Sequence, residues 1–544
     1  MNNAHDLTQS PDLTHERRTG PFRTQRPIYQ DLLPPCNHAC PAGENIQEWL
    51  SLATAGRYEE AWNVLLQDNP MPAIMGRVCY HPCETSCNRN QMDSAVSIHS
   101  VERFLGDLAL ENGWTPKVLA PPSSKKILVV GAGPSGLSCA YQLALQGHTV
   151  EIREAGPLAG GMMHFGIPAY RLPRNILDAE IKRIESIGVK IVLNHKVADL
   201  LAEMKEGGFD AAFTAVGAHL GKKVEIPSRD AGKILDAVSF LHDVELGFTP
   251  KLGRRVAIYG GGNTAMDAAR VAKRLGSDPL IIYRRDREHM PANEFEADEA
   301  IEEGVKIHWL RTIRSIMQSD ITVEVMKIGK DGRPEPTGEL ETIEADDLIL
   351  ALGQDTDTGF LASVPDMMFK PDGTVVVDDQ MMCSKEGIFA GGDMVPSERT
   401  VTVAVGHGKK AARNIDAFLR GTSYAKPVSP EVAKFEKLRL WFFAEVQKKN
   451  QTHLDMTERL GGFSEVAQGL TEPEARYEAQ RCFSCGNCFE CDGCYGACPE
   501  DAVIKLGVGN RYEYDYDRCT GCGACFEQCP CHAIEMTTDS EVVA

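Results

Sequence analysis

Three absences narrow the possibilities for this chain of 544 residues. Its longest apolar runs, such as Ile127–Val130 and Leu348–Leu352, are far shorter than the ~18 residues that a membrane-spanning helix needs. The first thirty residues contain no apolar signal-peptide core, so we expect a cytoplasmic protein without a membrane span. Positive charge is scarce, with 57 Lys and Arg against 77 Asp and Glu. A phosphate-binding surface needs a positive field, so we expect no nucleic-acid partner.

Cysteine, by contrast, is abundant and unevenly spread. Sixteen of the 18 cysteines fall into two blocks, five in residues 36–87 and eleven in residues 482–531. Because nothing indicates secretion, such clusters indicate metal or redox ligands rather than disulfides. The two isolated cysteines, Cys139 and Cys383, are expected to be buried packing residues.

A first dinucleotide-binding loop follows a β-rich run at residues 125–130. Its glycines allow a tight turn and a close approach of the backbone to a pyrophosphate, and the helix that follows offers free N–H groups to the anion. An acid at the end of the next strand can bind a ribose hydroxyl. The predicted binding residues are Gly131, Gly133, Pro134, Ser135, Gly136 and Glu154.

A second copy of this pattern follows a strand at residues 255–259, and two such folds in one chain indicate a flavin next to a nicotinamide. The predicted loop contacts are Gly260, Gly262, Asn263, Thr264 and Ala265.

The end of the next strand in this second copy carries Arg284, Arg285 and Arg287 in place of an acid. Arginines there fit the 2′-phosphate of NADPH better than NADH. The alternative is that they form ion pairs with neighbouring glutamates, namely Glu288, Glu294 and Glu296. The nucleotide is therefore expected to be NAD(P)H, with Arg284 and Arg285 as candidate contacts.

Two cysteine runs near the C-terminus have the spacing of a ferredoxin with two clusters. In such proteins the fourth cysteine of each run ligates the other cluster. The pattern predicts two [4Fe–4S] clusters, one bound by Cys488, Cys491, Cys494 and Cys529 and the other by Cys498, Cys519, Cys522 and Cys525. Cys531 is left as a spare.

Residues 387–393 and 400–408 resemble the C-terminal flavin motif of the two-dinucleotide-domain flavoproteins. In that motif the aspartate, here Asp393, binds the ribityl chain, and a helix start faces the isoalloxazine. The resemblance implies FAD as the flavin, in a domain split by an inserted NAD(P)H domain. It adds Gly392, Asp393, Thr400, Val401 and Thr402 to the expected FAD contacts, and Gly161 and Met162 are expected contacts as well. His407 is either a packing residue at the helix start or a proton donor.

Residues 31–420 as a whole resemble the small subunit of glutamate synthase and its relatives, which include the N-terminal half of dihydropyrimidine dehydrogenase. The chain departs from this family at both ends. The family's N-terminal Arg-Cys-x-x-Cys-Gly is absent, and Arg481-Cys-Phe-Ser-Cys-Gly486 occurs near the C-terminus instead. The matching strings are Gly76–Cys79, Val101–Phe104, Gly160–Pro168, Tyr283–Arg285, Met290–Ala292 and Thr400–Gly408.

The resemblance implies two further clusters in the N-terminal block. We expect Cys482 and Cys485 to replace the missing pair, so that one cluster would be bound by Cys36, Cys87, Cys482 and Cys485. The other would be bound by Cys40, Cys79, Cys83 and Glu102, because Met75 stands where some relatives carry a fourth cysteine. The alternative is that Glu102 is a surface acid on a helix.

The expected fold is multidomain: an α-helical iron–sulfur domain, two α/β Rossmann-like domains and an α+β bacterial-type ferredoxin domain. The expected boundaries are a flexible tail at 1–30, the helical domain at 31–120, the first segment of the FAD domain at 124–223, the NAD(P)H domain at 224–345, the second segment of the FAD domain at 346–425, a linker at 426–480 and the ferredoxin domain at 481–544.

Together these features predict a subunit that moves electrons between NAD(P)H and a partner redox enzyme. Flavin exchanges both hydride and single electrons and so belongs between nucleotide and clusters; no acid–base or nucleophilic residue is required. The C-terminal domain resembles that of subunits serving 2-oxoacid oxidoreductases and dissimilatory sulfite reductase, so a partner of either type, in a hetero-oligomer, is expected, with free ferredoxin as a further possibility. The alternatives are a glutamate synthase small subunit, a bifurcating enzyme and a non-catalytic iron–sulfur scaffold.

Overall fold

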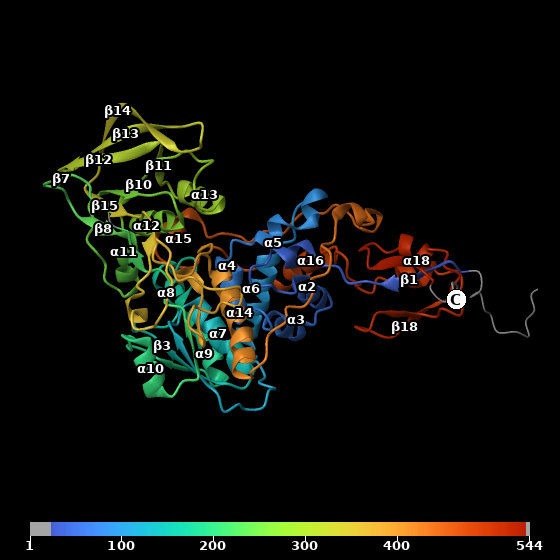
Figure 1. Cartoon of the computed structure of the whole chain (residues 1–544). Coiled ribbons are helices and arrows are strands. Elements are labelled where there is room, and N and C mark those ends of the chain that lie inside the picture. The colour runs from blue at the N-terminus through green and yellow to red at the C-terminus, as the bar shows by residue number, and fades with distance from the viewer. Residues whose placement is uncertain (1–22, 223, 540–544) are drawn as a thin grey trace, which may run out of the picture.

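The computed structural model describes residues 23–222 and 224–539. Figure 1 shows two nucleotide-type folds at the left, a helical module in the middle and a small cysteine-rich module at the right. Of the tail predicted for residues 1–30, the first 22 residues lie outside the described residues of the chain.

The helical module occupies residues 35–111 and buries Trp49 and Trp62 in its interior. A helix from much later in the chain, α16 (Glu472–Gln480), packs against α2 and α6 and completes it. The module's own helices are α1 (Pro35–Ala39), α2 (Ile46–Thr54), α3 (Tyr58–Leu65), α4 (Pro72–Val78), α5 (Pro82–Thr85), the 3-10 helix η2 (Asn88–Gln91) and α6 (Ile98–Glu111).

The first nucleotide-type fold is a parallel sheet with strand order β17-β5-β2-β3-β4. Strand β2 reads Lys-Ile-Leu-Val-Val and is central, which explains its continuous apolar run, because both faces of a parallel sheet are covered. Its elements are β2 (Lys126–Val130), α7 (Pro134–Leu145), β3 (Thr149–Arg153), α8 (Met162–Phe165), α9 (Arg174–Ser186), β4 (Lys190–Val192), α10 (Leu200–Gly207), β5 (Ala211–Thr214), η3 (Gly359–Leu361), β17 (Ile388–Ala390), η4 (Gly392–Met394) and α14 (Val401–Leu419).

The second nucleotide-type fold lies in the sequence between β5 and β17. Its parallel sheet has the order β11-β10-β9-β15-β8, and a mostly antiparallel sheet, β14-β13-β12-β7, adjoins it. Its elements are β7 (Ser228–Arg229), β8 (Ile234–Asp236), α11 (Ala237–Glu245), β9 (Arg255–Tyr259), α12 (Asn263–Arg274), β10 (Asp278–Tyr283), α13 (Glu294–Glu302), β11 (Lys306–Trp309), β12 (Arg311–Met317), β13 (Asp320–Ile328), β14 (Pro334–Glu344) and β15 (Asp347–Leu350).

One expected boundary between these folds is misplaced. The sequence boundary at residue 346 assigned residues 347–350 to the first fold, but β15 pairs with β8 and β9 of the second. The run is fully buried, and an apolar strand of this kind gains most from a central place in a parallel sheet. The crossing comes directly afterwards, where β16 (Gln354–Asp355) pairs with β6 (Leu220–Gly221).

Residues 426–480, expected to be a linker, form a strap that contacts both the second fold and the helical module. Val466 donates its backbone N–H to the Tyr170 carbonyl, and Arg459 pairs with Glu303 of the second fold. Glu465 pairs with Arg77 of the helical module. The polar composition resembles a linker because these charges are partners for charges on other modules. The strap contains η5 (Phe435–Lys437), η6 (Leu440–Phe442), α15 (Met456–Leu460) and α16.

The cysteine-rich module is closed by a strand from the other end of the chain. Residues of β1 (Gln25–Tyr29) pair antiparallel with β20 (Ile534–Thr538), so the expectation of a flexible tail is wrong for residues 25–29. Without β1 the edge of β20 would carry unpaired backbone groups, which are costly when buried. The module's other elements are α17 (Gly493–Ala497), β18 (Val503–Lys505), β19 (Tyr512–Tyr514) and α18 (Ala524–Glu527).

Across the described residues, no helix combines the length and the apolar character that a bilayer crossing requires.

Candidate redox site

The glycine loops of the two nucleotide-type folds open onto one cavity of about 1540 Å³. The first loop contributes Gly131, Gly133, Pro134 and Ser135, and the second contributes Gly262, Asn263 and Thr264. Glu154, Gly161, Met162, Gly392, Asp393, Thr400 and Val401 also line it. Because one cavity joins the two loops, two nucleotides bound there would face each other.

The first loop turns sharply between β2 and α7, and two of its positions require glycine. Gly131 has a φ of +103°, which strains a side-chain-bearing residue. A Cβ on Gly136 would stand 2.0 Å from the Gly131 carbonyl oxygen. Gly136 therefore shapes the loop rather than lining the cavity.

The residues at this loop fit a bound FAD. The hydroxyl of Ser135 is buried and has no hydrogen-bond partner within the described residues, which is costly unless a ligand supplies one. Gly133 has open space where a Cβ would stand, so a ligand can approach its backbone. Burial raises the pKa of the Asp393 carboxyl to about 6, and Arg399 opposes the rise. A hydroxyl of a bound ligand would give that carboxyl a polar partner.

Three other residues expected near the flavin have structural roles that can be stated. Glu154 accepts backbone N–H groups from Ala132 and Gly156, both at 2.8 Å. Thr402 does not line the cavity; its hydroxyl lies 3.0 Å from the Cys79 sulfur. His407 accepts the Gly392 N–H at Nδ1, at 3.2 Å, which favours the packing role over that of a proton donor.

The second loop is fixed from the helical module. Asn263, the first residue of α12, donates its amide to the Tyr80 hydroxyl at 2.7 Å and accepts the Asn293 N–H at 2.8 Å. Tyr80 lines the cavity and follows Cys79 directly in sequence. The nucleotide loop and a predicted cluster ligand are thus joined by one residue and one hydrogen bond. Gly260 and Ala265 lie outside the cavity lining.

The arginines at the end of β10 differ in their pairing. Arg287 forms an ion pair with Asp298, not with the expected glutamates. Arg284 and Arg285 form no ion pair within the described residues of the chain. The Arg285 Nε is buried there without a hydrogen-bond partner. Neither Arg284 nor Arg285 lines the cavity itself.

The cysteine-rich module gathers both ferredoxin-type thiol sets. Cys498, Cys519, Cys522 and Cys525 surround one small cavity. In the other set, burial raises the pKa of the Cys488 thiol to about 12, and the charges of the neighbouring Cys494 and Cys529 add to this rise. Backbone N–H groups point at several of these sulfurs, as in Ala502 to Cys498 at 3.3 Å and Ala533 to Cys529 at 3.2 Å. Such donors stabilise thiolates, the form that binds iron.

The residues that directly follow the strap bring Cys482 and Cys485, here called the strap cysteines, to the helical module. Cys36, Cys87, Cys482 and Cys485 line one cavity, although the pairs lie about four hundred residues apart in sequence. Arg481 holds this part of the chain against the helical module: its side chain is 2 % exposed and pairs with Asp93 and Glu478. The Ser484 N–H points at Cys482 at 3.3 Å. The four thiols expected to share a cluster therefore do lie together.

The remaining thiol set lies between this cavity and the nucleotide cavity. Cys40 and Cys79 are neighbours of Glu102, and Cys83 is a neighbour of both thiols. Glu102 is 6 % exposed, so the alternative of a surface acid is excluded. Burial and the charge of Glu44 raise the pKa of Glu102. Asn69 donates to both carboxylates, at 2.7 Å to Glu102 and 3.1 Å to Glu44. No sequence signal pointed to Glu44, because an acid four residues after Cys40 has no diagnostic spacing.

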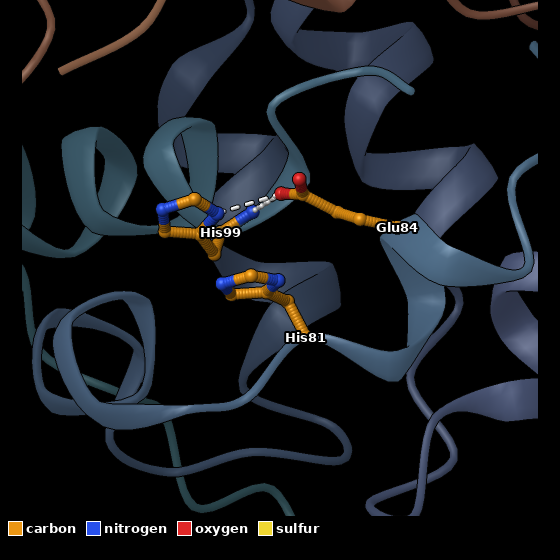
Figure 2. Close-up of side chains that lie close together, drawn as sticks. All are labelled: His81, Glu84 and His99. Atoms are coloured by element: carbon orange, nitrogen blue, oxygen red, sulfur yellow. Dashed lines mark hydrogen bonds and ion pairs between the residues drawn. The ribbon is translucent and has the colours of Figure 1, made fainter. Parts of the chain in front are cut away.

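A second group that the sequence patterns did not indicate is His81, Glu84 and His99, whose possible ligand atoms lie within 4.8 Å of one another. Figure 2 shows the two imidazole rings stacked, with centroids 4.3 Å apart and planes 19° apart. Ring nitrogens bind metals in the plane of the ring, so parallel stacked rings do not converge on one ion. Glu84 is already paired with His99 at 2.6 Å and with Lys448 at 2.9 Å. The group instead braces the loop between Cys79 and Cys83.

Comparisons with known proteins agree with this arrangement. Residues 123–408 match the family model described as pyridine nucleotide-disulphide oxidoreductase. Residues 28–114 match dihydropyrimidine dehydrogenase domain II, 4Fe-4S cluster, and residues 512–535 match a 4Fe-4S binding domain.

Three curated relatives align over most of the chain. The NADP(+)-dependent formate dehydrogenase subunit beta of Moorella thermoacetica is 35% identical over 83% of this chain and 70% of its own. The NADPH-Fe(3+) oxidoreductase subunit beta of Geobacter sulfurreducens is 33% identical over 83% of this chain and 75% of its own. The glutamate synthase [NADPH] small chain of Azospirillum brasilense is 31% identical over 72% of this chain and 88% of its own.

The fold, the shared cavity and these matches define an FAD-dependent NAD(P)H oxidoreductase with [4Fe–4S] clusters. More particularly, the chain belongs to the pyridine nucleotide-disulphide oxidoreductase family, in the group that includes the glutamate synthase small chain and its iron–sulfur relatives. The resemblance inferred from the sequence motifs is confirmed.

Proposed function

We propose that this chain is the NADPH-side subunit of a hetero-oligomeric oxidoreductase, passing electrons between NADPH and a catalytic partner. The observation that carries the proposal is the continuity of the site. The two nucleotide loops share one cavity, Tyr80 lines that cavity, and the neighbouring Cys79 belongs to the first of several thiol sets.

Bound FAD supplies the chemistry that links a two-electron hydride donor to one-electron clusters. The chain's own residues hold and orient the groups. The first loop and the Asp393 segment would hold the FAD, and the second loop would hold NADPH opposite it. Arg284 and Arg285, which lack ion pairs among the described residues, favour NADPH through its 2′-phosphate.

The proposed ligand sets follow one another away from the cavity. Cys79 comes first, and Cys83 lies near Cys36 of the set that includes the strap cysteines. Gly486 and Asn487 then lead from Cys485 directly to Cys488. The proposed ligands are Cys40, Cys79, Cys83 and Glu102; Cys36, Cys87, Cys482 and Cys485; Cys488, Cys491, Cys494 and Cys529; and Cys498, Cys519, Cys522 and Cys525.

The proposed exit for electrons is the last of these sets. Cys522 is the exposed member of the chain's cysteines, whereas the other three thiols around its cavity are more covered. The segment from Gly486 onward carries 11 Asp and Glu against 3 Lys and Arg. Acidic surface near an exit would steer a basic face of the partner toward it, although it would equally serve solubility.

The partner is proposed by chemical class. A 2-oxoacid oxidoreductase or sulfite-reductase type of subunit remains our proposal, and the formate dehydrogenase relative adds a third kind of catalytic subunit. The glutamate synthase small chain remains the alternative, and the additional C-terminal module argues against it. Bifurcation and a non-catalytic scaffold have no specific observation in their favour.

The test is an anaerobic pull-down of the tagged chain from its native cells, with partners identified by mass spectrometry. Recovery of a catalytic redox subunit is the expected result; recovery of a glutamine-dependent synthase would move the chain to ammonia assimilation. In parallel, NADPH should bleach the flavin and produce reduced-cluster signals in electron paramagnetic resonance. Pure anaerobic protein without FAD would contradict the proposal.

A further inference from the structure

Two stacked tyrosines lie between the thiol sets of the cysteine-rich module. Tyr29 is the last residue of β1, and Tyr514 is the last residue of β19. Their ring centroids are 5.0 Å apart with planes 24° apart. The pair therefore joins a strand from the start of the chain to the hairpin of the C-terminal module.

Each hydroxyl of the pair lies at a different thiol set. The Tyr29 hydroxyl is 3.4 Å from the Cys494 sulfur, within hydrogen-bond distance for an O–H donor to sulfur. The ring of Tyr514 lines the cavity surrounded by Cys498, Cys519, Cys522 and Cys525. Its hydroxyl is buried without a hydrogen bond of standard geometry within the described residues, and it lies near Cys525 of that set and near Tyr29. A buried hydroxyl without a partner is costly, and sulfur atoms bound in that cavity would supply an acceptor.

We propose that Tyr29 and Tyr514 tune the reduction potentials of the two ferredoxin-type clusters, one hydroxyl to each. This inference rests on the proposed function, because it requires that the thiol sets bind clusters. Tyr29 would donate to Cys494 and raise the potential of the cluster held by Cys488, Cys491, Cys494 and Cys529. Tyr514 would act in the same way on the other.

The direction follows from charge. A reduced cluster carries one more negative charge than the oxidised cluster, so an O–H donor at its sulfur stabilises the reduced form more. Hydrogen bonds to the sulfurs are among the factors that set cluster potentials. Loss of the hydroxyl therefore makes reduction harder, and the midpoint potential becomes more negative.

The N-terminal strand thereby has a role in electron transfer beyond closing the sheet. The segment 481–544 contains all eight ferredoxin-type ligands but not Tyr29. The tuning group of one cluster is thus delivered by β1, which pairs with β20 through residues 25–29. Only the folded full chain places it there.

The experiment compares Tyr29→Phe with Tyr516→Phe in the full chain, purified anaerobically. Tyr516 is a matched control, because its hydroxyl donates to the Pro27 carbonyl at 2.9 Å. It therefore links the same strand to the same module without a hydrogen bond to sulfur. Iron, acid-labile sulfide and FAD are measured first, and midpoint potentials are then obtained by redox titration followed by electron paramagnetic resonance.

We expect Tyr29→Phe to keep full iron and FAD while one ferredoxin-type cluster becomes harder to reduce, by up to tenfold in its equilibrium constant, or about 59 mV for one electron. Tyr514→Phe should shift the other cluster, and Tyr516→Phe should shift neither. Unchanged midpoints in Tyr29→Phe and Tyr514→Phe with full iron would overturn the inference and leave the proposed function intact. Iron loss from Tyr29→Phe alone would assign that residue to folding and overturn its tuning role. A wild-type chain without iron would refute the proposed function itself.

Discussion

The nucleotide-type folds and the iron–sulfur modules assemble their sites in different ways. Each nucleotide loop is one contiguous strand–turn–helix unit, and its key residues lie within a few positions of one another. The thiol sets of the iron–sulfur modules draw on distant segments, such as Cys36 and Cys482. A backbone loop can cradle a phosphate locally, whereas enclosing a cube of iron and sulfur requires ligands from several directions.

The largest expected effect is a loss of iron when the ligands that a distant segment supplies are removed. Replacing Cys482 and Cys485 together by Ser should remove one cluster, or about four of the roughly sixteen iron atoms that four [4Fe–4S] clusters contain. FAD should remain, because the nucleotide loops do not depend on the strap cysteines. Iron and flavin analysis of the anaerobic protein measures both, with Cys139→Ser as a control for a buried thiol outside every set. Unchanged iron would rule out a cluster shared with the strap cysteines, Cys482 and Cys485.

The opposite result, loss of FAD with retention of iron, is expected when a nucleotide loop formed by neighbouring residues is disrupted. Gly136→Val places a side chain where even a Cβ would stand 2.0 Å from the Gly131 oxygen, so the first loop must open. We expect nearly complete loss of FAD while most iron is retained. Gly462→Ala, which has open space around its Cβ position, is the control. If the Gly136→Val variant contained as much FAD as the wild type, the first loop would not be the FAD site.

A smaller effect distinguishes the two nucleotides at the second loop. Replacing Arg284 and Arg285 together by Ala should raise the KM for NADPH about tenfold, equivalent to about 1.4 kcal/mol, and leave that for NADH unchanged. The reason is loss of positive charge for a 2′-phosphate. Arg287→Ala is the matched control, because Arg287 is paired with Asp298. Equal changes for NADPH and NADH would argue against selection by these arginines.

The weakest change concerns the buried Glu303, which pairs with Arg270 and Arg274 of its own fold and with Arg459 of the strap. Burial would raise the pKa of Glu303, but hydrogen bonds from Arg274 and Arg270 hold it at about 2. Since the unfolded value is about 4.3, the ionised carboxylate stabilises the fold above that pH, and its contribution disappears as pH falls toward 2.

Glu303→Gln should therefore lower the melting temperature at pH 7 by about 2–4 °C. The difference from wild type should shrink between pH 5 and pH 3 in thermal unfolding scans. Glu344→Gln, at an exposed ion pair with Arg255, should change little. A pH-independent difference would show that the Glu303 charge is not what stabilises these ion pairs.

Much of the fold could be predicted because its signals are local. The buried run of β2, the glycines after it and the helix start at Pro134 form one continuous pattern of sequence. Such patterns reflect steric and hydrogen-bonding requirements that neighbouring residues satisfy themselves. The same holds for the two ferredoxin-type runs, whose spacing sets three thiols around one face of a cluster.

The errors occurred where a segment's role is decided by a distant partner. Residues 25–29 have no strong strand pattern, and they become a strand because β20 has an edge to fill. The strap resembled a linker because Arg459 and Glu465 are charged, and only their partners on other modules make them structural. Local propensity does not contain this information.

Short windows of sequence specify the modules and the kinds of group that they bind, because glycine loops and cysteine spacings carry their chemistry within a few residues. How the modules join is set in three dimensions: one cavity for two loops, Tyr80 between a nucleotide loop and Cys79, and Tyr29 beside Cys494. These contacts link residues far apart in the chain. Their formation depends on the packing of whole modules, which no short pattern encodes.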